Sequence, residues 1–135
     1  MRVTERSAIA AIAVVCVIGS ATAAEMTGTE IKDFVSGKSV YLELTATSSG
    51  GAGQGVIYYA TDGTALYKTA TGVTWHGTWA IKGNTACTDW KERPNNPCTK
   101  YDKQGDAITI LNAETGQLRG KVLKTAAGNA EKITP

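Results

Sequence analysis

The spacing of apolar residues changes once along the chain, near residue 37. Before that point, the run from Thr27 to Glu30 has the pattern of a capping box, in which the threonine hydroxyl and the glutamate carboxylate bond the first helical turn. Gly37 stands where a left-handed residue ends a helix. Between them, three apolar residues recur at helical spacing: Ile31, Phe34 and Val35. The pattern predicts a short helix over residues 28–36.

After the helix the apolar period falls to two, and Gly, Asn and Asp interrupt the chain every eight to twelve residues. This rhythm is typical of a meandering antiparallel sheet. Asp62-Gly63 is the strongest hairpin signal and predicts a two-residue type I′ turn, in which both central residues have positive φ. Eight strands are predicted, over residues 38–45, 55–61, 64–69, 73–81, 85–91, 98–102, 107–112 and 117–124.

Alternation is clearest in the strand over 73–81. Its odd-numbered residues should face the core: Val73, Trp75, Gly77, Trp79 and Ile81. Its even-numbered residues should face solvent: Thr74, His76, Thr78 and Ala80.

Three stretches lack this alternation. Residues 45–53, rich in serine and glycine, predict a flexible connection at one end of the sheet, because no side chain there is large enough to fix it. Residues 92–97, with two prolines flanking two asparagines, predict a short loop. Residues 125–135 are small and polar and are expected to fray.

About eight strands with one apolar face would leave bare edges and exposed apolar surface in an open sheet. Closure into a barrel solves both problems, and a folded-over sandwich would do the same. We therefore predict a mainly β protein, a small antiparallel up-and-down β-barrel with a short N-terminal helix. Three tryptophans, five tyrosines and one phenylalanine indicate a largely filled interior.

The N-terminus has the layout of a secretory signal. Arg2 and Arg6 precede an apolar run from Ala8 to Ile18, and a small-residue segment ends in Ala21-Thr22-Ala23. An apolar run of this length is too short for a membrane span, which needs about 20 residues. We expect cleavage after Ala23, a single domain over 24–135, and a location in the periplasm or outside the cell. Cys16 would be discarded with the signal.

Two cysteines, Cys87 and Cys98, remain in the mature chain. An even pair in an exported protein predicts a disulfide, since oxidising compartments favour it. Their spacing fits neither zinc-site nor Cys-x-x-Cys redox patterns. The bond would close the loop over 92–97 at its base.

Composition and motifs exclude several functions. The mature chain would carry 12 basic and 11 acidic residues, so no strong field directs it to nucleic acid or to an anionic membrane. No Gly-x-Gly-x-x-Gly, Walker or Gly-x-Ser-x-Gly motif is present in the required context. His76 is the single histidine, and no spacing ties Asp62, Asp89 or Asp106 to it. We expect no enzyme, no cofactor, no metal site and no stable membrane insertion.

The candidate binding surface combines exposed aromatic residues with the charged and polar loop beside Cys87. Tyr58 and Tyr59 must point to opposite faces of one strand, so one of them is exposed. A loop held by a disulfide presents a pre-ordered surface, because its ordering is no longer a cost of binding. The candidate residues are Tyr58, Tyr59, Asp89, Trp90, Arg93, Asn95 and Asn96.

Several short motifs of the mature chain resemble small exported proteins of alphaproteobacteria, the DUF995-like group. They are Thr27-Gly28-Thr29-Glu30-Ile31, Val35-Ser36-Gly37-Lys38-Ser39-Val40, Tyr58-Tyr59-x-x-Asp62-Gly63-Thr64-Ala65, Gly77-Thr78-Trp79-x-Ile81, Cys87-x-x-Trp90 and Cys98. That group implies no activity. More loosely, Gly77-Thr78-Trp79 followed by a disulfide resembles the calycin-type barrels of lipocalins, avidins and periplasmic protease inhibitors.

From these patterns we expect an exported, non-enzymatic binding module. A sharper version is an inhibitor of a secreted hydrolase that uses the stapled loop together with the glycine-rich loop, provided both lie at one end of the barrel. The alternatives are a lipocalin-like barrel for a small molecule and an envelope protein without a discrete site. The partner, protein or small ligand, is not identified by the sequence, and the chain is expected as a monomer or homodimer.

Overall fold

The computed structural model describes residues 10–15 and 23–135. Most of the expected signal, with Cys16, lies outside the described residues. The elements in chain order are β1 (Ala24–Glu25), α1 (Gly28–Val35), β2 (Lys38–Leu44), β3 (Gly53–Tyr59), β4 (Thr64–Lys68), β5 (Thr74–Lys82), β6 (Thr85–Trp90), β7 (Thr99–Gln104), β8 (Ala107–Asn112) and β9 (Leu118–Ala127).

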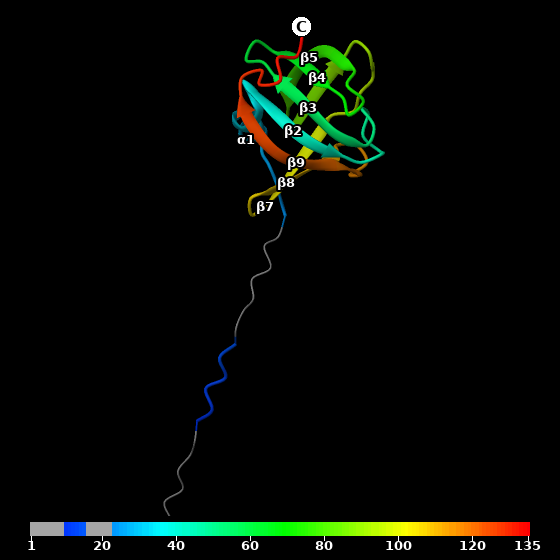
Figure 1. Ribbon diagram of the computed structural model, residues 1–135. Helices are drawn as coiled ribbons and strands as arrows, with labels where there is room; N and C mark the ends of the chain where they lie inside the picture. Colours follow the sequence, from blue (N-terminus) through cyan, green and yellow to red (C-terminus); the bar gives the residue numbers. More distant parts are fainter. Residues whose placement is uncertain (1–9, 16–22) are drawn as a thin grey trace, which may run out of the picture.

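Strands β2 to β9 form a closed antiparallel barrel (Figure 1). Each strand pairs with its neighbours in the chain, and β9 pairs with β2, so the predicted up-and-down barrel of eight strands is confirmed. The two-residue strand β1 was not predicted. It pairs with β7 at Asp102 and Lys103, where β7 is not paired with β6.

The seam between β6 and β7 is the weakest in the barrel, because within the described chain these strands pair only through Ala86 and Thr99. The predicted disulfide between Cys87 and Cys98 is confirmed, and it joins the residues next to that pair. It therefore staples the seam where backbone hydrogen bonds are fewest. Such a bond is typical of an oxidising compartment. No helix in the described ranges is long and apolar enough to cross a membrane.

Helix α1 begins with the predicted capping box. Thr27 Oγ1 accepts a hydrogen bond from the Glu30 N–H, and the Glu30 carboxylate accepts one from the Thr27 N–H. Ile31 and Val35 are fully buried and belong to the core cluster of the barrel. The helix ends before Gly37, whose positive φ confirms its predicted role as the helix stop.

The predicted alternation in β5 is confirmed within the strand, where Gly77 and Trp79 are buried and Thr78 is exposed. Val73 departs from the prediction. It lies in the turn before β5 and is 54% exposed, because alternation holds only where the chain is extended.

The hairpin at Asp62-Gly63 is confirmed, but the predicted turn type is wrong. Only Gly63 has positive φ, and its N–H donates to the Ala60 carbonyl. Asp62 instead accepts a hydrogen bond from the Thr64 N–H through its carboxylate. The connection is thus a four-residue turn with a single left-handed glycine.

The C-terminal residues were expected to fray, and this is wrong. β9 continues to Ala127, and residues 128–135 cross the outside of the barrel. They lie over a cross-strand row that faces outward: Ser39, Tyr58, Leu66 and His76. The tail is fixed at both ends of this row, because Ser39 Oγ donates to the Gly128 carbonyl and His76 contacts the Thr134 carbonyl. Local composition did not reveal these long-range bonds.

Candidate functional site

The glycine-rich loop, residues 45–52, and the stapled loop, residues 91–98, meet at one end of the barrel. The Ser49 hydroxyl donates a short hydrogen bond to Asn96 Oδ1. Asn96 Nδ2 in turn donates to Thr88 Oγ1 on β6, at 2.9 Å. The expectation that residues 45–53 are a flexible connection is therefore wrong, because side chains from other parts of the chain fix this loop.

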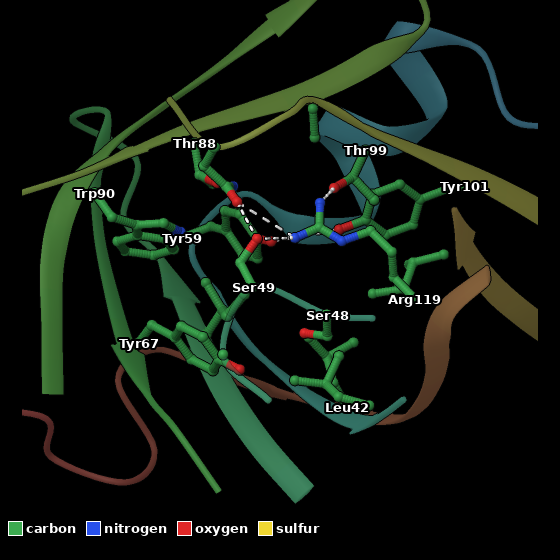
Figure 2. Close-up of a pocket in the computed structure, with 16 residues that line it drawn as sticks. Leu42, Ser48, Ser49, Tyr59, Tyr67, Thr88, Trp90, Thr99, Tyr101 and Arg119 are labelled. Atoms are coloured by element: carbon green, nitrogen blue, oxygen red, sulfur yellow. Dashed lines mark hydrogen bonds between the residues drawn. The ribbon is translucent and has the colours of Figure 1, made fainter. Parts of the chain in front are cut away.

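Beneath the two loops the barrel contains a small cavity of about 40 Å³ (Figure 2). A cavity of this size holds only a few atoms, which confirms the prediction of a largely filled interior. Leu42, Ile57 and Trp90 supply part of its apolar wall, and Tyr59 and Tyr101 lie beside it. The remaining polar lining consists of Ser48, Ser49, Thr88, Asn96, Thr99, Tyr67 and Arg119.

Arg119 enters the interior because β9 has a β-bulge at this residue. Leu118 pairs with Leu111 and Gly120 pairs with Ile110, so Arg119 is the extra residue between them. A bulge redirects side chains that strict alternation would place outside. Arg119 consequently points inward and is only 7% exposed.

The guanidinium of Arg119 is held by four neutral oxygen atoms. Nη1 donates to Thr99 Oγ1 at 2.9 Å and to the Pro97 carbonyl at 3.3 Å. Nη2 donates to Ser49 Oγ at 2.8 Å and to Asn96 Oδ1 at 3.4 Å. Among residues 10–15 and 23–135, no carboxylate forms an ion pair with this group.

Burial lowers the pKa of Arg119 from its ordinary value, because the charged guanidinium is desolvated. Its pKa is raised in part by three surrounding tyrosines: Tyr59, Tyr67 and Tyr101. Burial raises the pKa of each of these tyrosines, that of Tyr67 to about 12. At neutral pH the tyrosines are therefore uncharged, and the arginine supplies the single formal charge of the cavity.

Tyr67 is 3% exposed, and its hydroxyl is the one buried side-chain oxygen or nitrogen of the described residues without a hydrogen-bond partner of normal geometry. The Ser48 hydroxyl is close enough to lower the pKa of Tyr67 slightly. Gly50 and Gly55 lie directly against the phenol ring, and a Cβ at either position would collide with it. A buried hydroxyl left without a partner of normal geometry costs stability.

The predicted binding residues separate into two groups. Tyr59, Trp90 and Asn96 line the interior cavity. The other four lie elsewhere: Tyr58 on the outer wall under the tail, and Asp89, Arg93 and Asn95 on the exposed outside of the protein. Asn96 also lines a surface hollow together with Asp89 and Asn95, so the structure brings these three candidates together, whereas Tyr58 lies apart from them.

Sequence reasoning did not identify Arg119, Tyr67 or Ser49 as site residues. Tyr67 could have been found from the alternation of side chains along β4. Ala65 and Tyr67 share the inner face of this strand, and Leu66 between them faces outward. Arg119 had no such signal, because the bulge that turns it inward depends on the pairing of β8 with β9.

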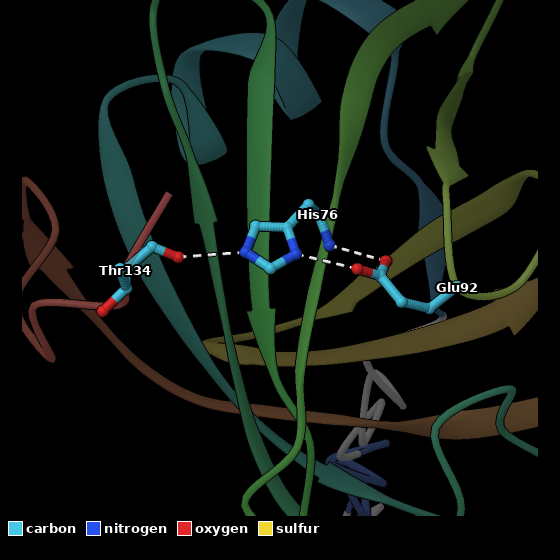
Figure 3. Close-up of polar contacts among 3 residues, drawn as sticks. All are labelled: His76, Glu92 and Thr134. Atoms are coloured by element: carbon cyan, nitrogen blue, oxygen red, sulfur yellow. Dashed lines mark hydrogen bonds and ion pairs between the residues drawn. The ribbon is translucent and has the colours of Figure 1, made fainter.

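His76 lies on the outer face of β5, as predicted, but it is tied to other groups (Figure 3). Its Nδ1 lies 2.7 Å from Glu92 Oε1, and its Nε2 lies 3.1 Å from the Thr134 carbonyl oxygen. The backbone N–H of His76 also donates to Glu92 Oε2. The acidic partner is thus Glu92 of the stapled loop, whereas the sequence had offered only Asp62, Asp89 and Asp106.

The two ring nitrogens of His76 thus face two oxygen atoms, one from the Glu92 carboxylate and one from the Thr134 backbone carbonyl. The group joins the stapled loop, β5 and the tail on the outside of the barrel. No nucleophile lies within this hydrogen-bonded group, which consists of His76, Glu92 and a backbone carbonyl. Within the described parts of the chain, no three histidine, cysteine or acidic side chains gather to hold a metal ion.

The fold and the site together define a small, closed up-and-down β-barrel with a small cavity at one end, lined by apolar side chains and several polar ones. Comparison of the chain with family models, with curated proteins and with solved structures gives no significant match. The resemblances noted from the sequence motifs therefore stay predictions. What the protein does must be argued from its own cavity.

Proposed function

We propose that this protein is a non-enzymatic binding module that holds a small ligand in the cavity beneath its two linked loops. The observation that carries the proposal is the Tyr67 hydroxyl, which is buried against the cavity without a partner of normal geometry. Unsatisfied buried hydroxyls are rare in folded proteins and often mark functional positions. A ligand that accepts or donates one hydrogen bond there would remove the cost.

The loops supply a way into the site. Ser49 holds the middle of the glycine-rich loop over the cavity, through its bonds to Asn96 and Arg119. Breaking these two contacts would free this part of the loop, while Thr45 and Thr47 keep its first residues on β9. The ligand would then reach the cavity from the end of the barrel opposite α1.

Export is part of the same proposal. Residues 1–23 have the pattern of a secretory signal, and the disulfide is consistent with the periplasm or the exterior. Cleavage after Ala23 would leave β1 intact, since β1 begins at Ala24. Protein isolated from the periplasm should therefore have the mass of residues 24–135 less two hydrogen atoms. A mass that still includes residues 1–23 would contradict export by cleavage.

A screen of very small fragments by two-dimensional NMR tests the binding function. Fragments that enter the cavity should shift the backbone amides of Ser49, Thr88 and Arg119, because these residues surround it. The amide of Asp106, on a distant turn, serves as the internal control. If no fragment shifts the cavity amides, and native mass spectrometry of periplasmic protein shows only the bare chain, the proposed function is wrong.

A second candidate function is favoured by a separate observation. Residues 91–95 are exposed although the loop is anchored by the disulfide and by Asn96. They therefore offer an ordered, accessible surface for a protein partner such as a secreted hydrolase. Arg93→Ala with Asn95→Gly should abolish inhibition of any hydrolase that the wild type inhibits. Unchanged inhibition by this variant would exclude the loop as the contact.

A further inference from the structure

We infer that the ligand of this cavity is a small, planar monoanion of the carboxylate type, such as formate or acetate, with Arg119 as its counter-charge. The inference rests on the proposed function and specifies its ligand class. It follows from three properties of the cavity: its charge, its hydrogen-bond donors and its size.

The charge comes first. Arg119 is 7% exposed and has no carboxylate partner among the described residues. A buried cation is expensive to desolvate unless an anion lies beside it, and neutral oxygens compensate only in part. An anion in the cavity would supply the missing opposite charge. Since the three neighbouring tyrosines stay protonated at neutral pH, none of them already plays that part.

The donors are placed to receive an oxyanion. A guanidinium is planar and presents paired N–H groups that match the two oxygens of a carboxylate. Two of the four bonds from Arg119 are long, at 3.3 Å to Pro97 and 3.4 Å to Asn96. An anion can take these N–H groups while the shorter bonds to Thr99 and Ser49 remain. The Tyr67 hydroxyl, which lines the same cavity, can donate one further hydrogen bond.

Size and charge count then select among anions. The cavity of about 40 Å³ has room for a few heavy atoms only. One formal positive charge matches a monoanion, whereas phosphate or sulfate would bring an excess negative charge into an apolar wall that includes Leu42, Ile57 and Trp90. Larger carboxylates would need the glycine-rich loop to move outward.

The test compares acetate with acetamide, which has nearly the same shape but no charge. Each is titrated into the oxidised protein at constant ionic strength, and the NMR shifts of the Ser49, Thr88 and Arg119 amides are followed. We expect acetate to shift these amides to saturation and acetamide to bind at least tenfold more weakly, because hydrogen bonds to a charged group are stronger.

Variants assign the effect to the cavity. Arg119→Met should lose acetate binding by about tenfold or more, and Tyr67→Phe should weaken it several-fold while keeping the fold. Lys103→Met is the control for loss of a positive charge, since Lys103 is exposed and lies outside the cavity, and it should leave the affinity unchanged. If Arg119→Met does not fold, Tyr67→Phe and Arg119→Lys carry the comparison, the latter retaining the charge without the planar fork.

The outcomes separate the inference from the proposed function. If acetamide and acetate bind equally well, the cavity binds ligands but the anion inference is overturned. The anion inference is also overturned if acetate does not shift the cavity amides and a neutral fragment does. If acetate binds equally to wild type, Arg119→Lys and Tyr67→Phe, the anion site lies outside the cavity, and the inference is again overturned.

Discussion

Arg119 and Tyr67 are costly residues for the barrel interior. One brings a charge without a carboxylate partner among the described residues, and the other brings a hydroxyl without a partner of normal geometry. Apolar side chains of similar volume would pack as well and avoid both penalties. At the scale of single residues, stability and the binding that we propose therefore make opposite demands on this cavity.

Tyr67→Phe should stabilise the ligand-free protein. The change removes a buried hydroxyl that has no normal hydrogen bond and keeps the ring against Gly50 and Gly55, so we expect a gain of about 1 kcal/mol. Urea unfolding in buffer free of carboxylates measures it. Tyr101→Phe is the control, because its hydroxyl lies 3.4 Å from that of Tyr59 and this pair would be lost. A loss of stability in Tyr67→Phe as large as in Tyr101→Phe would contradict the prediction.

Glu92 makes the protein sensitive to acid. The hydrogen bond from His76 is the largest cause that lowers the pKa of the Glu92 carboxyl. A carboxyl whose pKa is lower in the folded state stabilises the fold above its unfolded pKa, and this contribution is lost as the pH falls through the folded pKa, below about pH 4. Glu92→Gln should therefore flatten the decline of unfolding free energy between about pH 5 and pH 2.

Asp62 serves as the comparison in that experiment, because its pKa is also lowered, by the Thr64 N–H, at a site far from His76. Asp62→Asn should flatten the decline as well, and the double variant should show the sum of the two effects. Identical pH profiles for wild type and Glu92→Gln would show that the contact with His76 does not contribute.

At the scale of elements, the weak point of the barrel is the seam between β6 and β7. One pair of residues, Ala86 and Thr99, joins the strands, and the disulfide stands next to it. The stapled loop that follows β6 also carries Asn96 and Glu92, which reach the cavity and the tail group respectively. The disulfide thus positions residues that act at two separate places.

Removing the disulfide with Cys87→Ala and Cys98→Ala should cost about 3 kcal/mol, the value expected from chain entropy for a loop of this length. Amide hydrogen exchange should accelerate most in β6 and β7, since few hydrogen bonds remain across that seam. The β2–β3 hairpin, paired along its full length, is the internal reference. Uniform acceleration over all strands would contradict a local weakness at this seam.

For the whole molecule, the C-terminal tail acts as a strap across the outside of the closed barrel. It spans the outward row from Ser39 to His76 and covers it with Ile133, which is 5% exposed. Leu66 beneath it is buried although it lies outside the interior core. The barrel therefore buries apolar surface on both sides of its β2–β5 wall.

Ile133→Ala should destabilise the protein by about 2 kcal/mol, near the lower limit for a buried isoleucine because the site is close to the surface. Unfolding in urea measures this, and exchange of the Ala130 amide, which donates to Ser39 Oγ, reports release of the tail. Leu123→Ala is the matched control, because Leu123 remains 43% exposed and should cost much less. Equal losses for both variants would show that the tail is not packed on the barrel.

Local patterns in the sequence were sufficient for most of the fold. The capping box, the alternation in β5, the Asp-Gly hairpin and the cysteine pair act between neighbours or through parity, so α1, the eight barrel strands and the disulfide were predictable. An open sheet was excluded because it would have exposed the apolar face that these strands share. The strand ends differ from prediction by a few residues, as hydrogen-bond pairing decides them.

The cavity was decided by contacts between distant segments. Arg119 faces inward because of a bulge set by the register of β8 and β9. Ser49 is ordered by Asn96, and the tail by Ser39 and His76. Such contacts have no local signature, since they form only after the barrel has closed. The sequence alone therefore determined the architecture, whereas the tertiary structure decided which polar groups share its interior.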